Sequence, residues 1–269
     1  MAKAKGESGG IVETIKTVFW ALVIAGLFRT LFFQPFWIPS ESMKSSLLVG
    51  DFLFVNKMAY GYSKYSCPFG LCPFEGRILG SDPLRGDVVV FRNPYTGDDY
   101  IKRLIGLPGD RVQMKDGRVL LNGTEVPQVP DGIFTEIYGP QGPMKNYPQC
   151  ENGAVGLNGI CEKSRSIETL PTGDGDATRS YPVLNIKDTA GLPDNTNVYT
   201  VPDGHYFFMG DNRDNSQDSR FQPGLQGGIG MVPAEYLIGR ADRIVFSSAG
   251  ASLWYFWTWR ADRFFLGIN

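Results

Sequence analysis

This 269-residue sequence has only one histidine and a net charge close to zero. The single histidine, His205, excludes every zinc motif that needs two histidines and leaves one chance for a histidine-based serine triad. The 26 basic and 28 acidic residues give a net charge of -2, which offers no basic surface for nucleic acid. We therefore expect no nucleic-acid partner, no metal and no cofactor. Any hydrolytic chemistry is expected to use another base, with His205 as a core or turn residue.

Charged residues are also rare near the N-terminus, where residues 11–33 are mostly apolar. A bilayer core of about 30 Å needs roughly 20 residues of helix, so this stretch predicts one transmembrane signal anchor in contact with lipid. Arg29 and the bulky Leu31 to Phe33 argue against a cleaved signal peptide. Three early lysines place residues 1–10 in the cytoplasm by the positive-inside rule, with the rest of the chain on the far side.

Only four cysteines are present, and all of them follow the predicted span. In an oxidising compartment their local spacing favours two disulfides, Cys67 to Cys72 and Cys150 to Cys161, although four cysteines allow three connectivities. A zinc site is disfavoured because the cysteines lack C-x2-C spacing and a neighbouring histidine.

Helical periodicity is scarce beyond the span, whereas short β-branched and aromatic runs alternate with 33 glycines and 18 prolines. The predicted strands are residues 51–55, 87–92, 100–105, 198–201, 205–209 and 238–246, with a hairpin turn at Asp116-Gly117. We predict a mainly β fold after the anchor, with an antiparallel β-barrel-like catalytic core built from residues 34–125 and 201–248. A β/loop subdomain, residues 126–200, is inserted in it and is expected to vary without touching the chemistry.

Residues 249–269 form a tail that is rich in tryptophan, phenylalanine and tyrosine with two arginines among them. Such a mixture suits a membrane interface. Packing of the tail on the barrel or the anchor explains the composition equally well, so both interpretations stay open.

Three segments could carry chemistry. Ser40 and Ser42 follow the span and would project to the same side of an extended backbone, although a turn or helix cap is an alternative. Lys102 lies between apolar neighbours on a predicted strand, where desolvation would favour the neutral amine that can accept a serine proton. Residues 210–220 are nearly all polar and cannot be buried without many hydrogen bonds. They lack the glycine and glutamate of a calcium loop.

Together these segments resemble the bacterial type I signal peptidase, or leader peptidase, family of membrane-anchored Ser/Lys proteases. The matching motifs are Pro39-Ser40-x-Ser42-Met43 with Leu47, Gly50-Asp51-x-x-x-Val55-x-Lys57, Tyr100-x-Lys102-Arg103-x-x-Gly106-x-Pro108-Gly109-Asp110-x-Val112, and Gly210 to Arg220. The sequence departs from the family pattern where Ser45-Ser46 replaces the usual Pro-Thr and Glu41 replaces a frequent glycine.

The resemblance implies that Ser42 is the nucleophile and Lys102 the general base. It also implies that the Ser40 hydroxyl and the Ser42 N–H form the oxyanion hole, and that Ser216 holds the Lys102 amine. Asp218 and Arg220 would brace that loop, and Arg103 would be structural. The residues implied to line the substrate site are Phe36, Ile38, Met43, Tyr100 and Ile101.

The implied substrates are signal peptides of exported preproteins, cleaved after small-x-small motifs. The enzyme would be a single-pass protein of the bacterial inner membrane with an extracytoplasmic catalytic domain, and a monomer is favoured. The rivals are a self-cleaving repressor of similar β fold and a non-enzymatic membrane-tethered β domain that binds a partner through residues 210–220. A penicillin-interactive enzyme is disfavoured because Ser42-Met43-Lys44 lacks S-x-x-K spacing.

Overall fold

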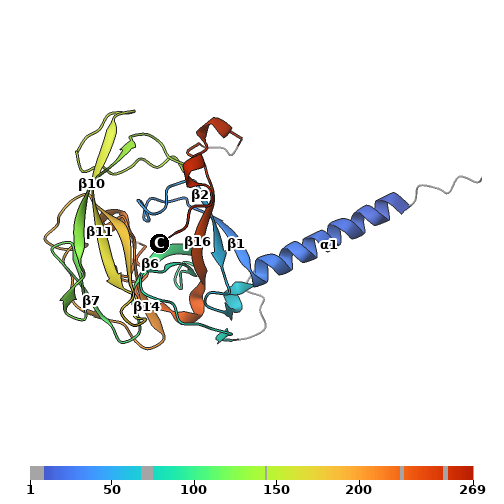
Figure 1. The fold of residues 1–269 in the computed structure, drawn as a ribbon, viewed down its shortest axis with the longest axis horizontal. Coiled ribbons are helices and arrows are strands. Elements are labelled where there is room, and N and C mark those ends of the chain that lie inside the picture. The colour runs from blue at the N-terminus through green and yellow to red at the C-terminus, as the bar shows by residue number, and fades with distance from the viewer. Residues whose placement is uncertain (1–8, 68–74, 143, 225–226, 251–253, 269) are drawn as a thin grey trace, which may run out of the picture.

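One long helix and many short strands make up the part of the chain that this computed structural model describes, which is residues 9–67, 75–142, 144–224, 227–250 and 254–268. Helix α1 (Gly9–Leu31) projects away from the strands (Figure 1). Its residues 10–31 are long and apolar enough to cross a membrane, and the apolar window is not buried at all. The helix of the predicted anchor is therefore confirmed.

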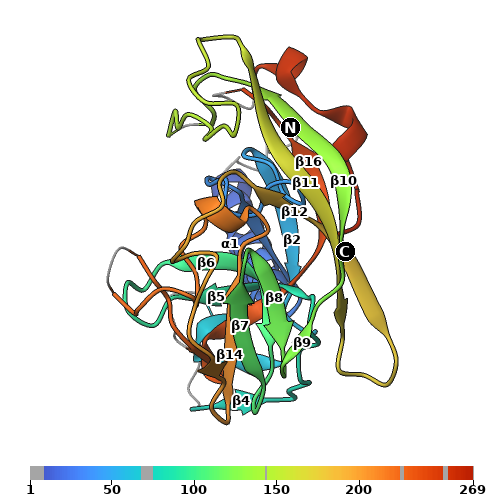
Figure 2. The same ribbon diagram turned by 90° about the vertical axis from the view of Figure 1, so that its left-hand side faces the viewer.

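The strands form a mainly antiparallel β structure around one curled seven-stranded sheet (Figures 1 and 2). Its order is β1 (Phe33–Trp37), β2 (Asp51–Asn56), β16 (Leu237–Ser247), β5 (Val88–Arg92), β6 (Asp99–Gly106), β14 (His205–Met209) and β15 (Val232–Pro233). Sequence neighbours such as β1 and β2 pair directly, whereas β16 from the end of the chain inserts between β2 and β5.

Three smaller sheets complete the fold. The first contains β13 (Tyr199–Thr200), β7 (Arg111–Lys115), β8 (Arg118–Leu121) and β9 (Thr124–Glu125), and the second pairs β3 (Tyr62–Ser63) with β4 (Arg77–Ile78). The third contains β10 (Gln128–Ile137), β11 (Ile160–Pro171) and β12 (Thr178–Asn185), which lie on the side opposite α1 in Figure 1. Short 3-10 turns are η1 (Lys64–Ser66), η3 (Arg213–Asn215), η4 (Ala234–Tyr236), η5 (Phe256–Thr258) and η6 (Ala261–Arg263).

Most predicted strands agree with the structure to within two residues at each end, and the predicted hairpin joins β7 to β8. Asp116 and Gly117 have φ values of 48° and 74°, as a primed two-residue turn requires. Strand β1 was not among the predicted strands, although its residues after Phe33 were assigned to the catalytic core. Pro35 explains the difference: it lacks an N–H and disfavours helix at the preceding residue, yet it is tolerated on an edge strand such as β1.

The main core lies on both faces of the central strands. Phe91 of β5 and Phe208 of β14 are fully buried and stack with ring centroids 4.6 Å apart, with Leu104 of β6 in the same cluster. Apolar packing and the backbone hydrogen bonds between strands therefore both fix the position of β6 relative to its neighbours. Since β6 carries Lys102, this packing also positions that lysine.

The Cys150–Cys161 disulfide is present, which confirms one of the two predicted pairs. Cys67 is also disulfide-bonded. Its predicted partner, Cys72, lies outside the described residues.

The C-terminal tail packs on the sheet through its arginines and some of its rings. Arg263 contacts the carboxylate of Asp51 at 2.6 Å, and the Trp259 ring lies 4.9 Å from that of Phe246. Trp254 and Trp257 nevertheless remain 88% and 69% exposed. The tail thus docks on the barrel by one side and presents aromatic rings on the other.

We expect Phe208→Ala to lower the free energy of unfolding by about 3 to 5 kcal/mol, because it leaves a cavity against Phe91 in a fully buried cluster. Denaturant unfolding of the full chain in detergent would measure the change. Ile137→Ala is the matched control, since Ile137 is 59% exposed and its truncation should cost under about 0.5 kcal/mol. An equal loss in both variants would contradict the assignment of the core.

Candidate active site

Ser42 lies in a buried turn between β1 and β2. The turn is held by apolar side chains on both sides of the serine, because Ile38, Met43 and Leu47 are all at most 1% exposed and share one cluster. Ser42 itself is 7% exposed. The two serines of the motif are close, with the Ser40 and Ser42 hydroxyl oxygens 3.5 Å apart, so a turn holds them together rather than a helix cap.

Lys102 reaches this turn from β6, where it pairs in register with Val89 of β5. Its Nζ lies 2.6 Å from Ser42 Oγ and 3.1 Å from the carbonyl oxygen of Ile101. The expected hydrogen-bond contact between Ser42 and Lys102 is therefore present.

The Lys102 amine is 4% exposed, and this burial lowers its pKa from 10.5 to about 8. The carboxylates of Asp218 and Asp211 act in the opposite direction and limit the shift. The side chain is thus neutral at a pH near physiological values in an appreciable fraction of molecules, which an ordinary surface lysine is not.

Most of the polar loop 210–220 is buried, and one arginine–carboxylate pair lies inside it. Arg220 binds Asp218 through two hydrogen bonds, of 2.9 and 2.8 Å. Asp218 also accepts the Gly210 N–H at 3.0 Å. Burial raises the pKa of this carboxyl, but Arg220 outweighs burial and holds it below the usual range. Asp218 is therefore a charged carboxylate that acts on Lys102.

A second arginine–carboxylate pair links the loop to β6 and to the turn between β1 and β2 that carries Ser42, called the nucleophile turn below for the role proposed for Ser42. Arg103, which is fully buried on the face opposite Lys102, makes two 2.7 Å hydrogen bonds to Asp211. Ser46 donates its hydroxyl to the same carboxylate at 2.5 Å. Arg103 is thus structural, as expected, whereas its partner Asp211 was not predicted as a site residue.

Backbone contacts place the loop directly against Ser42. The Asn212 N–H donates to the Ser42 carbonyl at 3.1 Å, which sequence reasoning missed because no side-chain pattern signals it. Gly210 permits the approach, since a Cβ there would lie 2.4 Å from the Ser42 carbonyl oxygen. Only glycine fits at this contact.

Ser216 differs from its expected role. Among the described residues the Lys102 amine makes its hydrogen bonds to Ser42 and Ile101 and none to Ser216, whose hydroxyl instead helps to lower the pKa of the Asp218 carboxyl. Ser216 lies near Gly210, where an added Cβ would be 2.3 Å from Ser216 Oγ. The amine takes the Ile101 carbonyl as its second contact.

The five expected substrate-lining residues gather around the same place. Ile38 and Met43 are buried in one cluster, and Ile101 packs partly exposed against it. Phe36 packs against a neighbouring cluster that also contacts Ile101, and Tyr100 lies beside Lys102, with its ring centre 5.5 Å from Nζ. The partly exposed side chains of Phe36, Tyr100 and Ile101 are therefore the members of this set that a substrate could touch, whereas Ile38 and Met43 are buried beneath the surface.

The inserted segment, which was expected to vary without touching the chemistry, contacts the turn that carries Ser42. Glu136 of β10 contacts Lys44, two residues after Ser42, at 2.6 Å. Most of loop 210–220, the segment of the alternative partner-binding role, is buried, including Asn212 and Asp218, whereas Gln217 is exposed. No cluster of three metal-ligating side chains occurs among the described residues.

The chain is similar in sequence to members of one protein family. The family model described as signal peptidase, peptidase S26, matches residues 11–246. The chain is 38% identical over 251 residues to Signal peptidase I of Rickettsia akari (strain Hartford), covering 88% of this chain and 81% of that protein. Signal peptidase I of Rickettsia typhi (strain ATCC VR-144 / Wilmington) is 37% identical over 248 residues, with coverages of 88% and 82%.

Among solved structures, a signal peptidase I from Enterococcus faecalis V583 is similar, with 22% identity and a TM-score of 0.30. The similarity covers 60% of this chain and 97% of that one. At this score it carries no argument about the present fold.

The burial of Lys102 predicts a pH-dependent stability. Its folded-state pKa of about 8 lies below the unfolded value of 10.5, so the folded protein binds fewer protons between these pH values and its stability rises with pH. Lys102→Met should therefore raise the free energy of unfolding at pH 7 by about 3 kcal/mol through this charge effect. The gain should shrink as pH rises through the window from about 8 to about 10.5.

Urea unfolding of the full chain in detergent at several pH values would measure this difference. Lys115→Met is the control, because Lys115 is exposed on β7 and its replacement should have no comparable pH dependence. A stability gain from Lys102→Met that is the same at pH 7 and above pH 10.5 would contradict the desolvation of the amine.

Proposed function

The chain belongs to the signal peptidase family, peptidase S26, and has signal peptidase I function; we propose that Ser42 and Lys102 are its catalytic dyad. The observation that supports the dyad is the 2.6 Å contact between the Lys102 amine and the Ser42 hydroxyl, made by a buried lysine whose pKa is lowered. A serine hydroxyl becomes a nucleophile only when a neighbouring base removes its proton, and the single histidine, His205, contacts the Asp203 carbonyl instead.

In the proposed mechanism, neutral Lys102 takes the Ser42 proton while Ser42 Oγ attacks the carbonyl carbon of the scissile peptide bond. The resulting ammonium then returns the proton to the leaving amine, and an acyl-enzyme ester remains on Ser42. Lys102, neutral again, removes a proton from water as the water oxygen attacks the ester carbon. The ester C–O bond then breaks, Lys102 returns the proton to Ser42 Oγ, and the second product leaves as a carboxylic acid. The Ser42 N–H and the Ser40 hydroxyl would stabilise the oxyanion, which fits the short distance between the two serines.

Signal peptides of exported preproteins are the proposed substrates, bound as an added β-strand. Residues Asp99–Ile101 of β6 pair with β5 on one side, while β14 pairs with β6 only from Arg103 onward. Among the described strands the second edge of Asp99–Ile101 is therefore unpaired, and an extended peptide could hydrogen-bond there. Its alternate side chains would meet the partly exposed side chains of Phe36, Tyr100 and Ile101, which suits small residues before the cleavage site.

The membrane anchor places this site near the bilayer. Strand β1 follows α1 after one residue, and the Ser42 turn follows β1 within the next few residues. We place the N-terminus in the cytoplasm and the catalytic domain on the outer face, since Lys3 and Lys5 precede the span and Lys16 lies in its first half. A substrate whose own apolar segment lies in the bilayer would thus present its cleavage site at the height of Ser42.

Ser42→Ala and Lys102→Ala should each reduce kcat for cleavage of a preprotein by at least about 10³-fold, because either change removes one half of the proton-transfer unit. A gel-shift assay with a preprotein bearing a small-x-small site would measure cleavage. Ser180→Ala and Lys115→Ala, both at exposed positions on other sheets, are controls and should cleave normally. Retained cleavage by Ser42→Ala would refute the dyad.

The activity should also follow the protonation of Lys102. Because the neutral amine is the proposed base, kcat/KM should rise with pH and level off above about pH 8. Initial rates in buffers of constant ionic strength would give the profile. A rise that continues to the ordinary lysine pKa of about 10.4 would show that the amine is not desolvated in the free enzyme.

A further inference from the structure

Lys44 carries a charge that the proposed mechanism does not use. It lies two residues after Ser42 and is 1% exposed. Its Nζ is surrounded by three acceptors: Glu41 Oε1 at 2.9 Å, Gln141 Oε1 at 2.8 Å and Glu136 Oε2 at 2.6 Å. Since an ammonium has three donors, this group is fully satisfied and has one preferred position.

Two of these acceptors come from the inserted segment. Glu136 lies on β10, 92 residues from Lys44 in sequence, and its second oxygen binds the fully buried Lys163 of β11. Gln141 also donates its amide to Glu136 at 2.6 Å. Burial acts to raise the pKa of Glu136, but the two lysines outweigh burial and hold this pKa below its usual range, so the carboxylate is charged.

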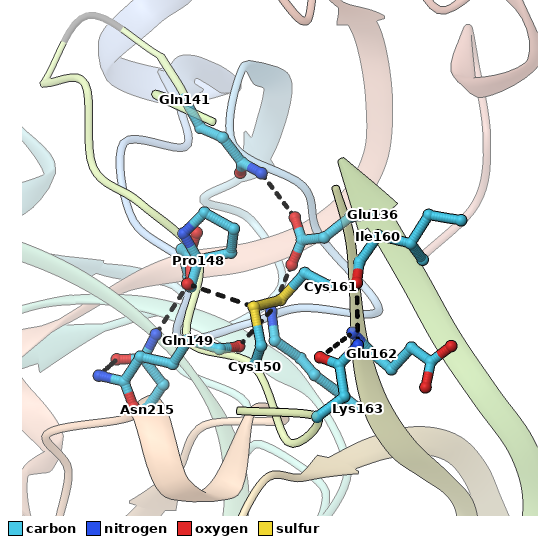
Figure 3. The surroundings of a disulfide bond; sticks show 12 residues. Glu136, Gln141, Pro148, Gln149, Cys150, Ile160, Cys161, Glu162, Lys163 and Asn215 are labelled. Carbon is cyan, nitrogen blue, oxygen red and sulfur yellow. Dashed lines mark hydrogen bonds and ion pairs between the residues drawn. A yellow bond between two sulfur atoms is a disulfide. The ribbon is translucent and has the colours of Figure 1, made fainter. Parts of the chain in front are cut away.

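The Cys150–Cys161 disulfide holds the neighbourhood of Glu136 (Figure 3). Cys161 lies directly opposite Glu136 in the register of β10 and β11. Gln149, next to the other cysteine, lies 3.4 Å from Asn215 of the polar loop, and Asn215 in turn binds Glu41 at 3.0 Å. The inserted segment therefore meets the polar loop and the nucleophile turn at one place.

The two ends of this network flank Ser42. Glu41 directly precedes Ser42 and is 5% exposed, and Lys44 follows Ser42 after one residue. Both ends of the short segment 41–44 are therefore held by buried charged contacts. Glu136 contributes the charge that comes from outside the turn. Without that carboxylate, Lys44 would keep one charged partner for a buried ammonium, and the turn would relax to satisfy it.

From this arrangement we propose that Glu136 is a positioning residue for the nucleophile: through Lys44 it fixes the turn that carries Ser42 in the orientation that Lys102 can deprotonate. The proposal rests on the proposed Ser42–Lys102 dyad. Glu136 touches neither reacting atom, so its effect is on geometry. An error of about 1 Å in a reacting group can lower a rate by as much as about 100-fold, which makes such a role measurable.

Glu136→Gln should reduce kcat for preprotein cleavage by about tenfold while KM changes by less than about twofold, because the partly exposed side chains proposed to contact the substrate are kept. Asp131→Asn is the matched control: it removes a carboxylate from the same strand, but Asp131 pairs with Arg165 at the surface, where both are over a third exposed. That control should retain wild-type kcat and KM. All variants are assayed as full chains at a temperature at which their thermal unfolding shows them folded.

A double-mutant cycle separates positioning from general stabilisation. If Glu136 acts through Lys44, Lys44→Met should lower kcat by about the same factor, and adding Glu136→Gln to Lys44→Met should lower it by less than about twofold more. A purely structural role for Glu136 predicts a lower melting temperature with unchanged kcat of the folded enzyme. Should Glu136→Gln fail to fold, Lys44→Met alone carries the test, since it leaves the Glu136–Lys163 pair intact.

The outcomes distinguish this proposal from the dyad itself. Wild-type kcat in Glu136→Gln or in Lys44→Met, together with inactive Ser42→Ala, would overturn the positioning role and leave the dyad in place. Equal and fully additive losses in the cycle would also overturn it. Cleavage by Ser42→Ala would remove both proposals at once.

Discussion

The arrangement of this protein depends on keeping one lysine amine uncharged and in contact with one serine hydroxyl. Lys102 is buried at the junction of β6, the nucleophile turn and the polar loop, and desolvation there lowers its pKa to about 8. Burial alone would lower the pKa still further, and the carboxylates of Asp218 and Asp211 oppose it. The pKa that results lies close to working pH, where a group can both accept and return a proton within one turnover.

That balance explains why so polar a loop is buried beside the site. An unpaired carboxylate near Lys102 would strongly favour the protonated form of the amine. Here Asp218 forms an ion pair with Arg220 and Asp211 forms one with Arg103, which weakens that effect. The arginines also saturate the carboxylates with hydrogen bonds, so the loop is rigid as well as nearly neutral. The same pairs therefore set the electrostatics of the amine and fix the backbone that holds the Ser42 carbonyl.

Much of the fold and the central pair of residues could be predicted from sequence, because both leave local signals. Short runs of β-branched and aromatic residues bounded by glycine, proline or aspartate marked β2, β5, β6, β14 and β16, and a serine pair, a strand lysine and a polar loop marked three parts of the site. Strand β1 was missed, and only Pro35 signals the change from helix to strand. The partners of Lys44 were missed for a stronger reason: a contact across 92 residues has no local pattern, and the i,i+3 spacing of Glu41 and Lys44 only hints at a charge pair.

The nucleophile turn takes its shape from parts of the chain that are distant in sequence. The polar loop binds the Ser42 carbonyl, the tail arginine Arg263 binds the Ser46 carbonyl at 3.0 Å, and Glu136 of the inserted sheet binds Lys44. In an unfolded chain Lys102 would keep a pKa near 10.4 and would be cationic at neutral pH, so it could not deprotonate a serine. The proposed base exists only when these distant segments are docked, because the packing that positions the turn is also the packing that removes water from the amine.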